Sequence, residues 1–532
     1  MDVRLVALAT ALLGVTAAVL YYQQELTLSH YDAKGHLVVA RRIFDSLRPG
    51  WWQIGAVWLP LPHLLNMLPV QIDWLYRTGL SAVAMSIACF SATATTIWWW
   101  IRRSTGSRIA AAAGTLVFAT QPDVLYLQST PMTEPLLMAC TTLGVALIWR
   151  WVIEVMDAHD RTTTHAANAK DVADDAETAE RERRIARIGR WAGIAFAAAV
   201  LTRYEAWPIT AAALSLSVLV MIAMGAPIVG SFKRGFSIAI FPIVAILAFL
   251  ILSRATVGSW LVTGGFYIPD NPDYHRPFKA LGSVWWALRQ LNGTLTVSIA
   301  TGAALICLVI ALVRRVHRPL LIAAALTASA ALPAFAFYNG HPFRIRYMVT
   351  LTVATAVCGG LGIGLLPRIA RVAVAVLLAI VTLGETPPFP RTSPMLAEAQ
   401  WDKPRSHERQ KVTACLRAQY DGAPILASMG SLAHYMQETS HAGFNLRDYI
   451  HEGLGQIWTS SLEMGARHHA GWVLIEEQAE GGDELAKLRD VNPAFLAGFT
   501  RICEGGGVAL YKRDTASRAS LQKRTWNVAP SE

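Results

Sequence analysis

The sequence predicts an α-helical polytopic membrane protein with about eleven transmembrane helices and a small α/β domain near its C-terminus. The first observation is composition: the 532 residues are 53% hydrophobic and only 16% charged, and the mean hydropathy is +0.36. Soluble proteins carry about 25% charged residues, so this composition excludes a disordered or collagen-like chain and argues against an ordinary soluble enzyme. The other two observations are a series of long apolar runs and a change to polar sequence after Pro390.

Apolar runs of spanning length follow one another through the first 385 residues. A helix needs about 20 apolar residues to cross the hydrocarbon core of a bilayer. The first run resembles a signal peptide, but no convincing small-residue cleavage site follows it, so we expect it to remain as the first helix. The eleven predicted spans cover residues 3–22, 78–100, 109–126, 135–153, 188–205, 207–225, 236–254, 291–313, 319–338, 347–366 and 369–385.

The charges between the runs predict the topology, because Lys and Arg collect in cytoplasmic loops. Basic clusters follow the second, fourth, sixth, eighth and tenth runs, so eleven spans with a cytoplasmic N-terminus place all five clusters inside. A single span over 188–225 would move the later clusters outside, which favours two helices there with an outer turn between them. The net charge of +10 then reflects topology, and we expect no nucleic-acid partner. The clusters are Arg102/Arg103/Arg108, Arg181/Arg183/Arg184/Arg187/Arg190, Lys233/Arg234, Arg314/Arg315/Arg318 and Arg368/Arg371.

Three polar segments between the spans have separate predicted roles. Residues 157–190 are charged and present no apolar face, so we expect a partly helical cytoplasmic linker without chemistry. Residues 23–77 and 257–290 form the long outer loops. Outer loops held by a rigid scaffold are common places for functional side chains.

The first outer loop contains an amphipathic pattern. Apolar residues recur at helical spacing from Leu37 to Leu47, opposite Arg41, Arg42 and Asp45. This spacing predicts a helix that lies in the membrane interface with its charged face toward the headgroups. Tryptophans in the same loop are expected to anchor it at headgroup level; they are Trp51, Trp52, Trp58 and Trp74.

The chain becomes polar after residue 390 and alternates strand-like with helix-like segments. Strands are predicted at 424–428, 472–476 and 508–512, which indicates a small α/β domain. We therefore expect a transmembrane domain over 1–390, an extracytoplasmic domain over 391–514 and a disordered tail over 515–532. Cys415 and Cys503 could pair if that domain is outside, whereas the other four cysteines lie in apolar runs as small hydrophobes.

Ionisable side chains gather near the outer ends of the predicted spans. Such groups are costly at membrane depth and are functional candidates by default. Two acids, Asp32 and Glu134, and at least three cations suit glycosyl transfer from a lipid phosphate: a carboxylate accepts a proton while guanidinium groups neutralise the leaving phosphate. The cations and their neighbours are Arg203 with Tyr204 and Glu205, and His341, Arg344 and Arg346 with Tyr347.

Structural roles compete with this interpretation. Asp32 could cap a helix, Glu134 could favour a helix N-terminus through the macrodipole, and Arg203 could extend from a helix end toward the interface. Arg344 and Arg346 are harder to explain structurally, because positive residues on the outer side oppose the topology rule.

Four motifs resemble the GT-C superfamily of integral-membrane glycosyltransferases, in the group with protein O-mannosyltransferases and bacterial aminoarabinose-type lipid transferases. They are Tyr31-Asp32-Ala33-Lys34-Gly35-His36, Thr133-Glu134-Pro135, Leu201-Thr202-Arg203-Tyr204-Glu205-Ala206-Trp207-Pro208 and Arg344-Ile345-Arg346-Tyr347. The resemblance implies that Asp32 is the catalytic base and that Arg203 and the Arg346-Tyr347 pair bind a polyprenyl phosphate. Two departures are visible: the first loop has one acid where O-mannosyltransferases commonly have an adjacent pair, which weakens the case for a protein hydroxyl as acceptor. The second departure is Arg203, which stands at a position where many members of this superfamily have Lys.

The predicted function is that of an inverting glycosyltransferase that moves a hexose or pentose from a polyprenyl-monophosphate donor at the outer face of the cytoplasmic membrane. Asp32 and Glu134 are the predicted catalytic residues, and the phosphate ligands are Arg203, Arg344, Arg346 and Tyr347. Further substrate contacts are expected from Tyr31, His36, Tyr204, Glu205 and His341. Glu134 would bind the sugar or a divalent metal ion, and the sequence leaves metal dependence open.

The expected partners are the lipid-linked donor, a lipid, glycan or protein acceptor, and membrane lipids. Two other classes remain as alternatives: a lipid or sugar transporter or flippase, and a non-catalytic membrane assembly scaffold. Transporters often show inverted repeats and charges at the midplane. The sequence shows no such repeat, and its charged candidates lie at one face.

Overall fold

The computed structural model describes residues 2–167, 175–262, 271–479 and 481–514 of the chain. The tail predicted over 515–532 and parts of the 157–190 and 257–290 segments lie outside these residues. The chain divides into a bundle unit (Met1–Thr27, Ala56–Leu65 and Leu80–Glu398) and a C-terminal unit (Leu28–Gly55, Asn66–Gly79 and Ala399–Glu532). This division differs from the predicted boundary at residue 390, because most of the first outer loop groups with the C-terminal residues.

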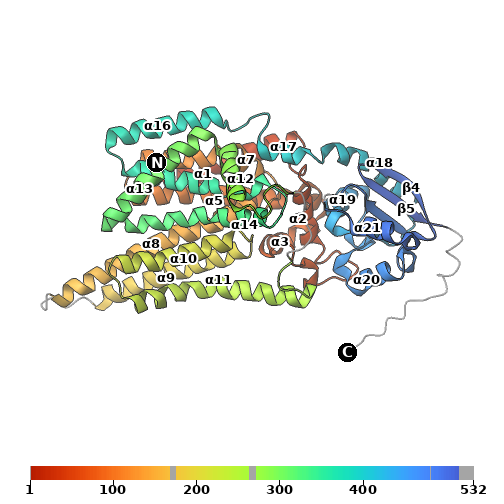
Figure 1. Ribbon diagram of the computed structural model, residues 1–532, viewed down its shortest axis with the longest axis horizontal. Helices are drawn as coiled ribbons and strands as arrows, with labels where there is room; N and C mark the ends of the chain where they lie inside the picture. The colour runs from red at the N-terminus through yellow and green to blue at the C-terminus, as the bar shows by residue number, and fades with distance from the viewer. Residues whose placement is uncertain (1, 168–174, 263–270, 480, 515–532) are drawn as a thin grey trace. The chain divides into compact units, whose positions relative to one another are not determined.

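The bundle unit is built from helices that run side by side, as α8, α9, α10 and α11 do in Figure 1. Its helices are α1 (Val3–Gln23), α5 (Leu80–Thr105), α6 (Arg108–Ala119), α7 (Pro122–Leu127), α8 (Glu134–Ala167), α9 (Asp175–Val200), α10 (Ala206–Ala223), α11 (Ile228–Val257), α12 (Pro277–Asn292), α13 (Thr294–Val313), α14 (Ala331–Tyr338), α15 (Leu351–Leu365) and α16 (Arg368–Glu385), with the 3-10 segments η3 (Arg315–Ala330) and η4 (Ile345–Met348). Helices α3 (Leu61–Asn66) and α17 (Pro394–Gln400) lie at the unit boundaries.

Within the described ranges, eight helical segments are long and apolar enough to cross a membrane. They match the predicted runs except 109–126, 188–205 and 369–385. The prediction of one spanning helix over 109–126 is wrong, because these residues form two helices, α6 and α7, that are separated by Thr120 and Gln121. Gln121 accepts a hydrogen bond from the Val124 amide and starts α7, so the polar pair ends one helix and caps the next. The twelve residues of α6 extend only about 18 Å.

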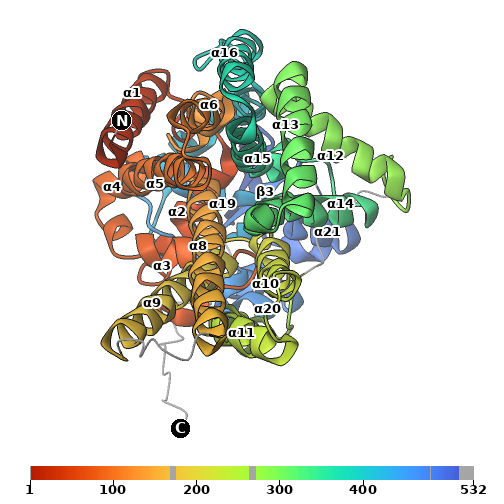
Figure 2. The ribbon, with the colours of Figure 1, turned by 90° about the vertical axis from the view of Figure 1, so that its left-hand side faces the viewer.

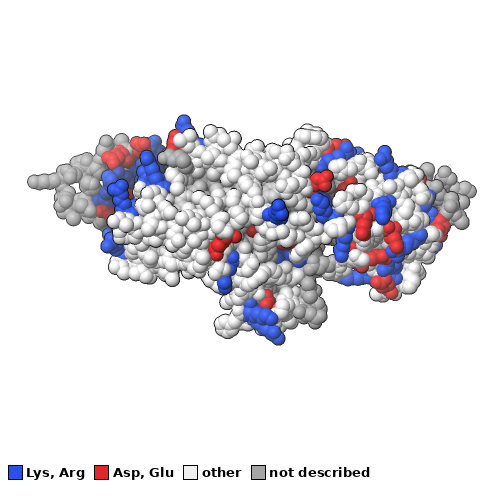
Figure 3. All heavy atoms as spheres, turned by 90° about the horizontal axis from the view of Figure 1, so that it is seen from above, with Lys and Arg blue, Asp and Glu red and all other residues white. Residues whose placement is uncertain are grey.

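The basic turns meet at one end of the bundle. Arg315, the first residue of η3, forms an ion pair of 2.9 Å with Asp160 of α8 and donates to the carbonyl of Met224, after α10. Arg318 donates to the neighbouring carbonyl of Ala223. Figure 3 shows Lys and Arg side chains gathered at the end where α8 ends and α9 begins, beside a largely uncharged bundle surface. Three of the predicted cytoplasmic turns therefore share one end, and α8 and α9 continue as helices into the predicted linker.

Small residues let the central helices approach closely. A Cβ on Gly362 of α15 would lie 1.9 Å from the carbonyl oxygen of Ala303 in α13, and a Cβ on Gly114 of α6 would lie 2.7 Å from that of Ala356. Figure 2 shows α15 next to both α6 and α13. Such contacts hold helices together in a bilayer, where the hydrophobic effect supplies no force between them.

The C-terminal unit joins two segments of the first outer loop to the end of the chain. The loop supplies α2 (Tyr31–Arg41), η1 (Trp51–Ile54), η2 (Pro69–Gln71) and α4 (Asp73–Thr78). The chain end supplies α18 (Lys403–Gln419), α19 (Met429–Thr439), α20 (Gln456–Glu463) and α21 (Glu484–Val491), with the short segments η5 (Ser440–Ala442), η6 (Leu446–Asp448), η7 (Glu452–Leu454), η8 (Ala466–His468) and η9 (Pro493–Leu496).

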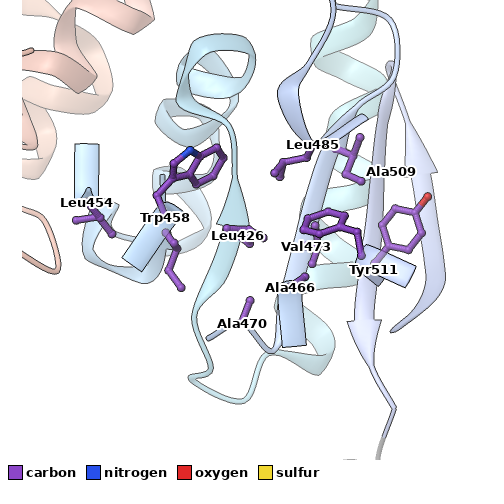
Figure 4. Close-up of a cluster of buried hydrophobic side chains, with 12 residues drawn as sticks. Leu426, Leu454, Trp458, Ala466, Ala470, Val473, Leu485, Ala509 and Tyr511 are labelled. Atoms are coloured by element: carbon purple, nitrogen blue, oxygen red, sulfur yellow. The ribbon is translucent and has the colours of Figure 1, made fainter. Parts of the chain in front are cut away.

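The sheet of the described C-terminal residues has five strands in the order β2-β1-β3-β5-β4. Strand β1 (Ile425–Ala427) is parallel to β2 (Tyr449–Ile450) and β3 (Trp472–Glu476), and β5 (Val508–Arg513) is antiparallel to β3 and β4 (Phe499–Gly505). Figure 4 shows apolar side chains of β1, β3 and β5 packed with Trp458 of α20 in a buried cluster. The three predicted strands are present, and β2 and β4 are additional.

Cys415 of α18 and Cys503 of β4 form a disulfide with a Cα–Cα distance of 6.6 Å. The bond links residues 88 positions apart and fastens α18 to an edge strand of the sheet. Crosslinks that close long loops stabilise small domains, typically by 2–4 kcal/mol. The pairing that the sequence left open is therefore present in the fold.

The predicted interfacial helix is wrong in its position and environment. Helix α2 begins at Tyr31, and residues 32–41 are all buried, including its charged positions. Arg41 pairs with Asp45 at 2.9 Å and with Asp73 at 2.7 Å, and Asp45 is 1% exposed. Helical spacing was detected correctly, but the charges pair within the C-terminal unit, packed beside α19, instead of facing headgroups.

Removal of residues 399–532 tests this shared packing. The bundle is expected to insert, because every predicted span lies before residue 399. The segment 28–55 should become sensitive to protease, since the burial of Leu37 and Val38 at 0–1% exposure depends on this unit. Limited proteolysis of full-length and truncated protein in nanodiscs measures this, and equal resistance of the segment would contradict it.

Candidate functional site

Three separated segments of the bundle unit bring the predicted donor-site residues together. Glu134 begins α8, with Pro135 at a position that needs no amide donor. Arg203, Tyr204 and Glu205 lie in the turn between α9 and α10, and α8 packs against α9. The third segment is η4, which contains Arg346 and Tyr347.

Arg203 is the centre of this cluster. Its guanidinium pairs with Glu134 Oε1 at 2.9 Å and with Glu205 Oε1 at 2.7 Å. Nε donates to the same Glu205 oxygen at 3.0 Å, and Nη1 donates to the Thr133 hydroxyl at 3.1 Å. The two carboxylates thus contact different nitrogens of the guanidinium: Glu134 contacts Nη1, and Glu205 contacts Nε and Nη2. The contact between the Thr133 hydroxyl and Arg203 was not predicted from the sequence, although Thr133 belongs to the Thr133-Glu134-Pro135 motif.

The cluster is largely withdrawn from solvent. The side chains of Glu134, Glu205 and Arg203 are 1%, 6% and 14% exposed. Burial lowers the pKa of Arg203, but Glu134 and then Glu205 raise it, and the net direction is upward. Arg203 is therefore a permanent cation, and its removal would leave two carboxylates without their counter-ion.

A second guanidinium lies near the same aromatic ring as the first. Arg346 Cζ lies 5.5 Å from the ring centroid of Tyr347, and Arg203 Cζ lies 5.9 Å from the same centroid. Arg346 is 7% exposed and its charge opposes the protonation of Arg203. The ring of His341 lies 5.6 Å from that of Tyr347, and Arg344 immediately precedes η4. The structure therefore gathers most of the predicted phosphate-site residues around Tyr347.

Apolar packing fixes the turn that carries Arg203. The ring of Tyr204 lies 5.4 Å from Trp207 and 6.2 Å from Phe249 of α11. The indole of Trp207 donates to the carbonyl of Val200 at 3.0 Å, and the Leu61 amide donates to that of Leu201 at 3.0 Å. Tyr204 thus packs against apolar rings, and this packing fixes the turn from which the guanidinium of Arg203 extends.

The remaining predicted residues, Tyr31, Asp32 and His36, lie in α2 of the C-terminal unit. The helix cap is His30, whose Nδ1 accepts a hydrogen bond from the Asp32 amide at 3.1 Å. Asp32 is in the first helical turn and is 8% exposed. The capping role that competed with a chemical role for Asp32 is therefore filled by another residue.

Among the described residues, the bundle cluster does not fit a divalent metal ion. Both carboxylates of the bundle cluster already pair with Arg203. Across the described residues, no group of three His, Cys, Asp or Glu side chains has an arrangement suited to hold a metal.

No known protein family and no curated protein sequence matches the chain. Among solved structures, ArnT from Cupriavidus metallidurans bound to undecaprenyl phosphate aligns over 95% of this chain and 98% of its own, with 12% identity and a TM-score of 0.57. Its apo state gives a TM-score of 0.56 over the same shares. AglB from Archaeoglobus fulgidus, in complex with an inhibitory peptide and a dolichol-phosphate, aligns over 91% and 72% with 11% identity and a TM-score of 0.47. The likeness to ArnT shows the fold, and the expected architecture of a helical membrane bundle with a small C-terminal sheet domain is confirmed.

Proposed function

We propose that this protein is an inverting glycosyltransferase that uses a polyprenyl-monophosphate-linked sugar. The observation that carries the proposal is the pair Arg203 and Arg346 at one tyrosine ring, beside the buried carboxylates of Glu134 and Glu205. Guanidinium groups in a desolvated site are suited to bind a phosphate, because they can donate paired hydrogen bonds to it. The fold is that of ArnT, which was solved with undecaprenyl phosphate bound, and this supports the same class of lipid phosphate here.

The reaction has a simple balance. The acceptor oxygen forms a bond to the anomeric carbon while the bond from that carbon to the phosphate oxygen breaks, and its electron pair leaves with the phosphate. Asp32 accepts the proton of the acceptor hydroxyl, and attack opposite the leaving group inverts the anomeric configuration. Arg203 and Arg346, with Tyr347 and Arg344, stabilise the growing phosphate charge. Glu134 holds Arg203 and binds the sugar.

The two competing classes have less support. A transporter would place its charges near the midplane. Here the cluster lies where α8 begins and α9 ends, whereas the basic turns gather where α8 ends and α9 begins. A scaffold gives no reason to bury two arginines and two carboxylates together at the cost of their desolvation.

We propose that the cluster lies at the outer face of the cytoplasmic membrane, that the C-terminal unit is extracytoplasmic, and that the N-terminus is cytoplasmic. The disulfide between Cys415 and Cys503 supports this, because such bonds persist in oxidising compartments. Single cysteines at Val491, which is 85% exposed, and at exposed Arg183 of α9 test it. A membrane-impermeant maleimide should label position 491 in intact cells and position 183 only after lysis. The reverse pattern would overturn the orientation.

A single-turnover assay tests the function. Purified protein in nanodiscs is mixed with a radiolabelled polyprenyl-phosphate sugar and an envelope extract as the source of acceptor. The glycosyltransferase should release polyprenyl phosphate and transfer the label, whereas a transporter would leave the donor intact. The Asp32→Asn variant is the control for contaminating activity. Intact donor after many minutes with every extract, although the lipid binds, would contradict the proposal.

A further inference from the structure

A chain of buried ion pairs joins α2 to the C-terminal helices. Lys34 Nζ lies 2.6 Å from Glu438 Oε1 of α19. Glu438 also accepts hydrogen bonds from Arg409 of α18, at 2.8 and 3.0 Å, and Arg409 pairs with Asp402 through both terminal nitrogens at 2.6 and 2.9 Å. Arg409 is 1% exposed, and the side chains of Lys34 and Glu438 are 8% and 16% exposed.

The positive and negative side chains of these ion pairs are equal in number. Burial raises the pKa of Glu438, but Lys34 and Arg409 lower it, and the net direction is well below its usual range. Glu438 is therefore a carboxylate at neutral pH, and the network contains two basic residues, Lys34 and Arg409, and two acidic ones, Glu438 and Asp402. Ion pairs this far from solvent hold a fixed geometry, because separation of the partners exposes an uncompensated charge.

The pairing contributes, with the burial of α2, to the rotation of the helix about its own axis. Residues two positions apart on a helix are turned by about 200° from each other. Lys34 points to α19, so Asp32 projects from nearly the opposite face of the same helix. A small change in the Lys34–Glu438 contact would rotate or shift the carboxylate of Asp32.

A second group of contacts holds the segment that follows α2 against the C-terminal residues of the same unit. Asp45 pairs with Arg447 at 2.8 Å and accepts hydrogen bonds from the amides of Leu446 and Arg447 at 3.2 and 3.3 Å. Gln53 donates to the carbonyl of Gly453 at 3.0 Å. The end of the helix is thus held by contacts that do not involve Lys34, so loss of the Lys34 contact should shift α2 without releasing it.

We propose that Lys34 and Glu438 are positioning residues through which the C-terminal unit orients Asp32 for proton transfer. The proposal rests on the proposed function, in which Asp32 is the base. It assigns the C-terminal unit a part in the chemical step, distinct from acceptor recognition. Misplacement of a reacting group by about 1 Å can slow a reaction about 100-fold, so even a modest movement of α2 is measurable.

The experiment compares Lys34→Met with wild type in nanodiscs. This change removes one of the two cations, and Arg409 remains bonded to both Glu438 and Asp402. Thermal unfolding of the variant is measured beside its rate, so that a loss of folding is distinguished from a loss of positioning. We expect the single-turnover rate to fall about 10- to 100-fold with donor affinity within about twofold of wild type. Lys34→Arg, which keeps the pair, should recover most of the rate, and Glu438→Gln should reproduce the loss. Glu477→Gln, which disrupts exposed pairs with Arg489 and Arg501 in the same unit, is the matched control and should leave the rate unchanged.

The outcomes separate the two proposals. A wild-type rate for Lys34→Met, while Asp32→Asn is slow, would overturn the positioning role and leave the proposed function standing. An equal loss of donor affinity and rate would also overturn it, because the pair would then support the fold as a whole. A wild-type rate for Asp32→Asn would instead remove the proposed base, whatever Lys34→Met does.

Discussion

Asp32→Asn is expected to lower the single-turnover rate by about two to four orders of magnitude, the usual span for loss of general base catalysis. Asparagine keeps the size of the side chain and its hydrogen-bonding capacity in the first turn of α2, so the helix should persist. The cap is supplied by His30, and the change therefore removes no capping interaction. Affinity for the donor should stay near the wild-type value, since the proposed phosphate ligands are elsewhere in the sequence.

Two measurements accompany the rate. Thermal unfolding of Asp32→Asn should match wild type within a few degrees, and binding of polyprenyl phosphate by titration should be unchanged. Asp73→Asn, a similar substitution in the same unit at a half-exposed ion pair with Arg41, serves as the control for general effects of charge removal. If Asp32→Asn turned over at the wild-type rate, the acceptor would be an anion that needs no base, or Asp32 would have no part in the chemistry.

Helical periodicity and hydropathy predicted the bundle well, because each spanning helix must bury its own backbone polar groups and needs a long apolar run to do so. Three runs, 109–126, 188–205 and 369–385, have no match among the eight spanning segments of the described residues. In 109–126, hydropathy averages over Thr120 and Gln121, although these two residues end α6 and begin α7. Two strands, β2 and β4, escaped prediction for different reasons. The former has only two residues, and β4 has no fully buried residue and lacks a clear apolar alternation.

Long-range packing limited the prediction of the first outer loop. The pattern from Leu37 to Leu47 is amphipathic, and periodicity alone cannot distinguish a membrane surface from a protein surface as the partner of a helix. The partner is α19, almost 400 positions later, and pairs such as Lys34–Glu438 have no local signal. Arg203 and Glu134, by contrast, were found because ionisable groups beside apolar runs are costly and stand out in the sequence.

Arg203→Ala is expected to affect both stability and donor binding. It leaves the carboxylates of Glu134 and Glu205 buried without a counter-ion, which costs about 3–5 kcal/mol for a buried pair. It also removes a cation from the proposed phosphate site, a loss of about 2–5 kcal/mol in binding. The affinity for polyprenyl phosphate should fall by about 30- to 4000-fold at about 1.4 kcal/mol per factor of ten. Arg203→Lys should recover much of the binding, but less of the stability, because one ammonium cannot reproduce the contacts with Thr133, Glu134 and Glu205.

Neutral carboxamides separate the two effects. In the triple variant Arg203→Met, Glu134→Gln and Glu205→Gln, the two carboxylates that Arg203 pairs with are replaced by neutral amides, so thermal stability should return toward wild type. Binding of polyprenyl phosphate should remain weak, because the cation that meets the phosphate is still absent. Titration of the lipid into nanodiscs and thermal unfolding of the same samples measure both quantities. If the triple variant bound the lipid as wild type does, Arg203 would serve only to compensate the carboxylates, and Arg346 would be the principal phosphate ligand.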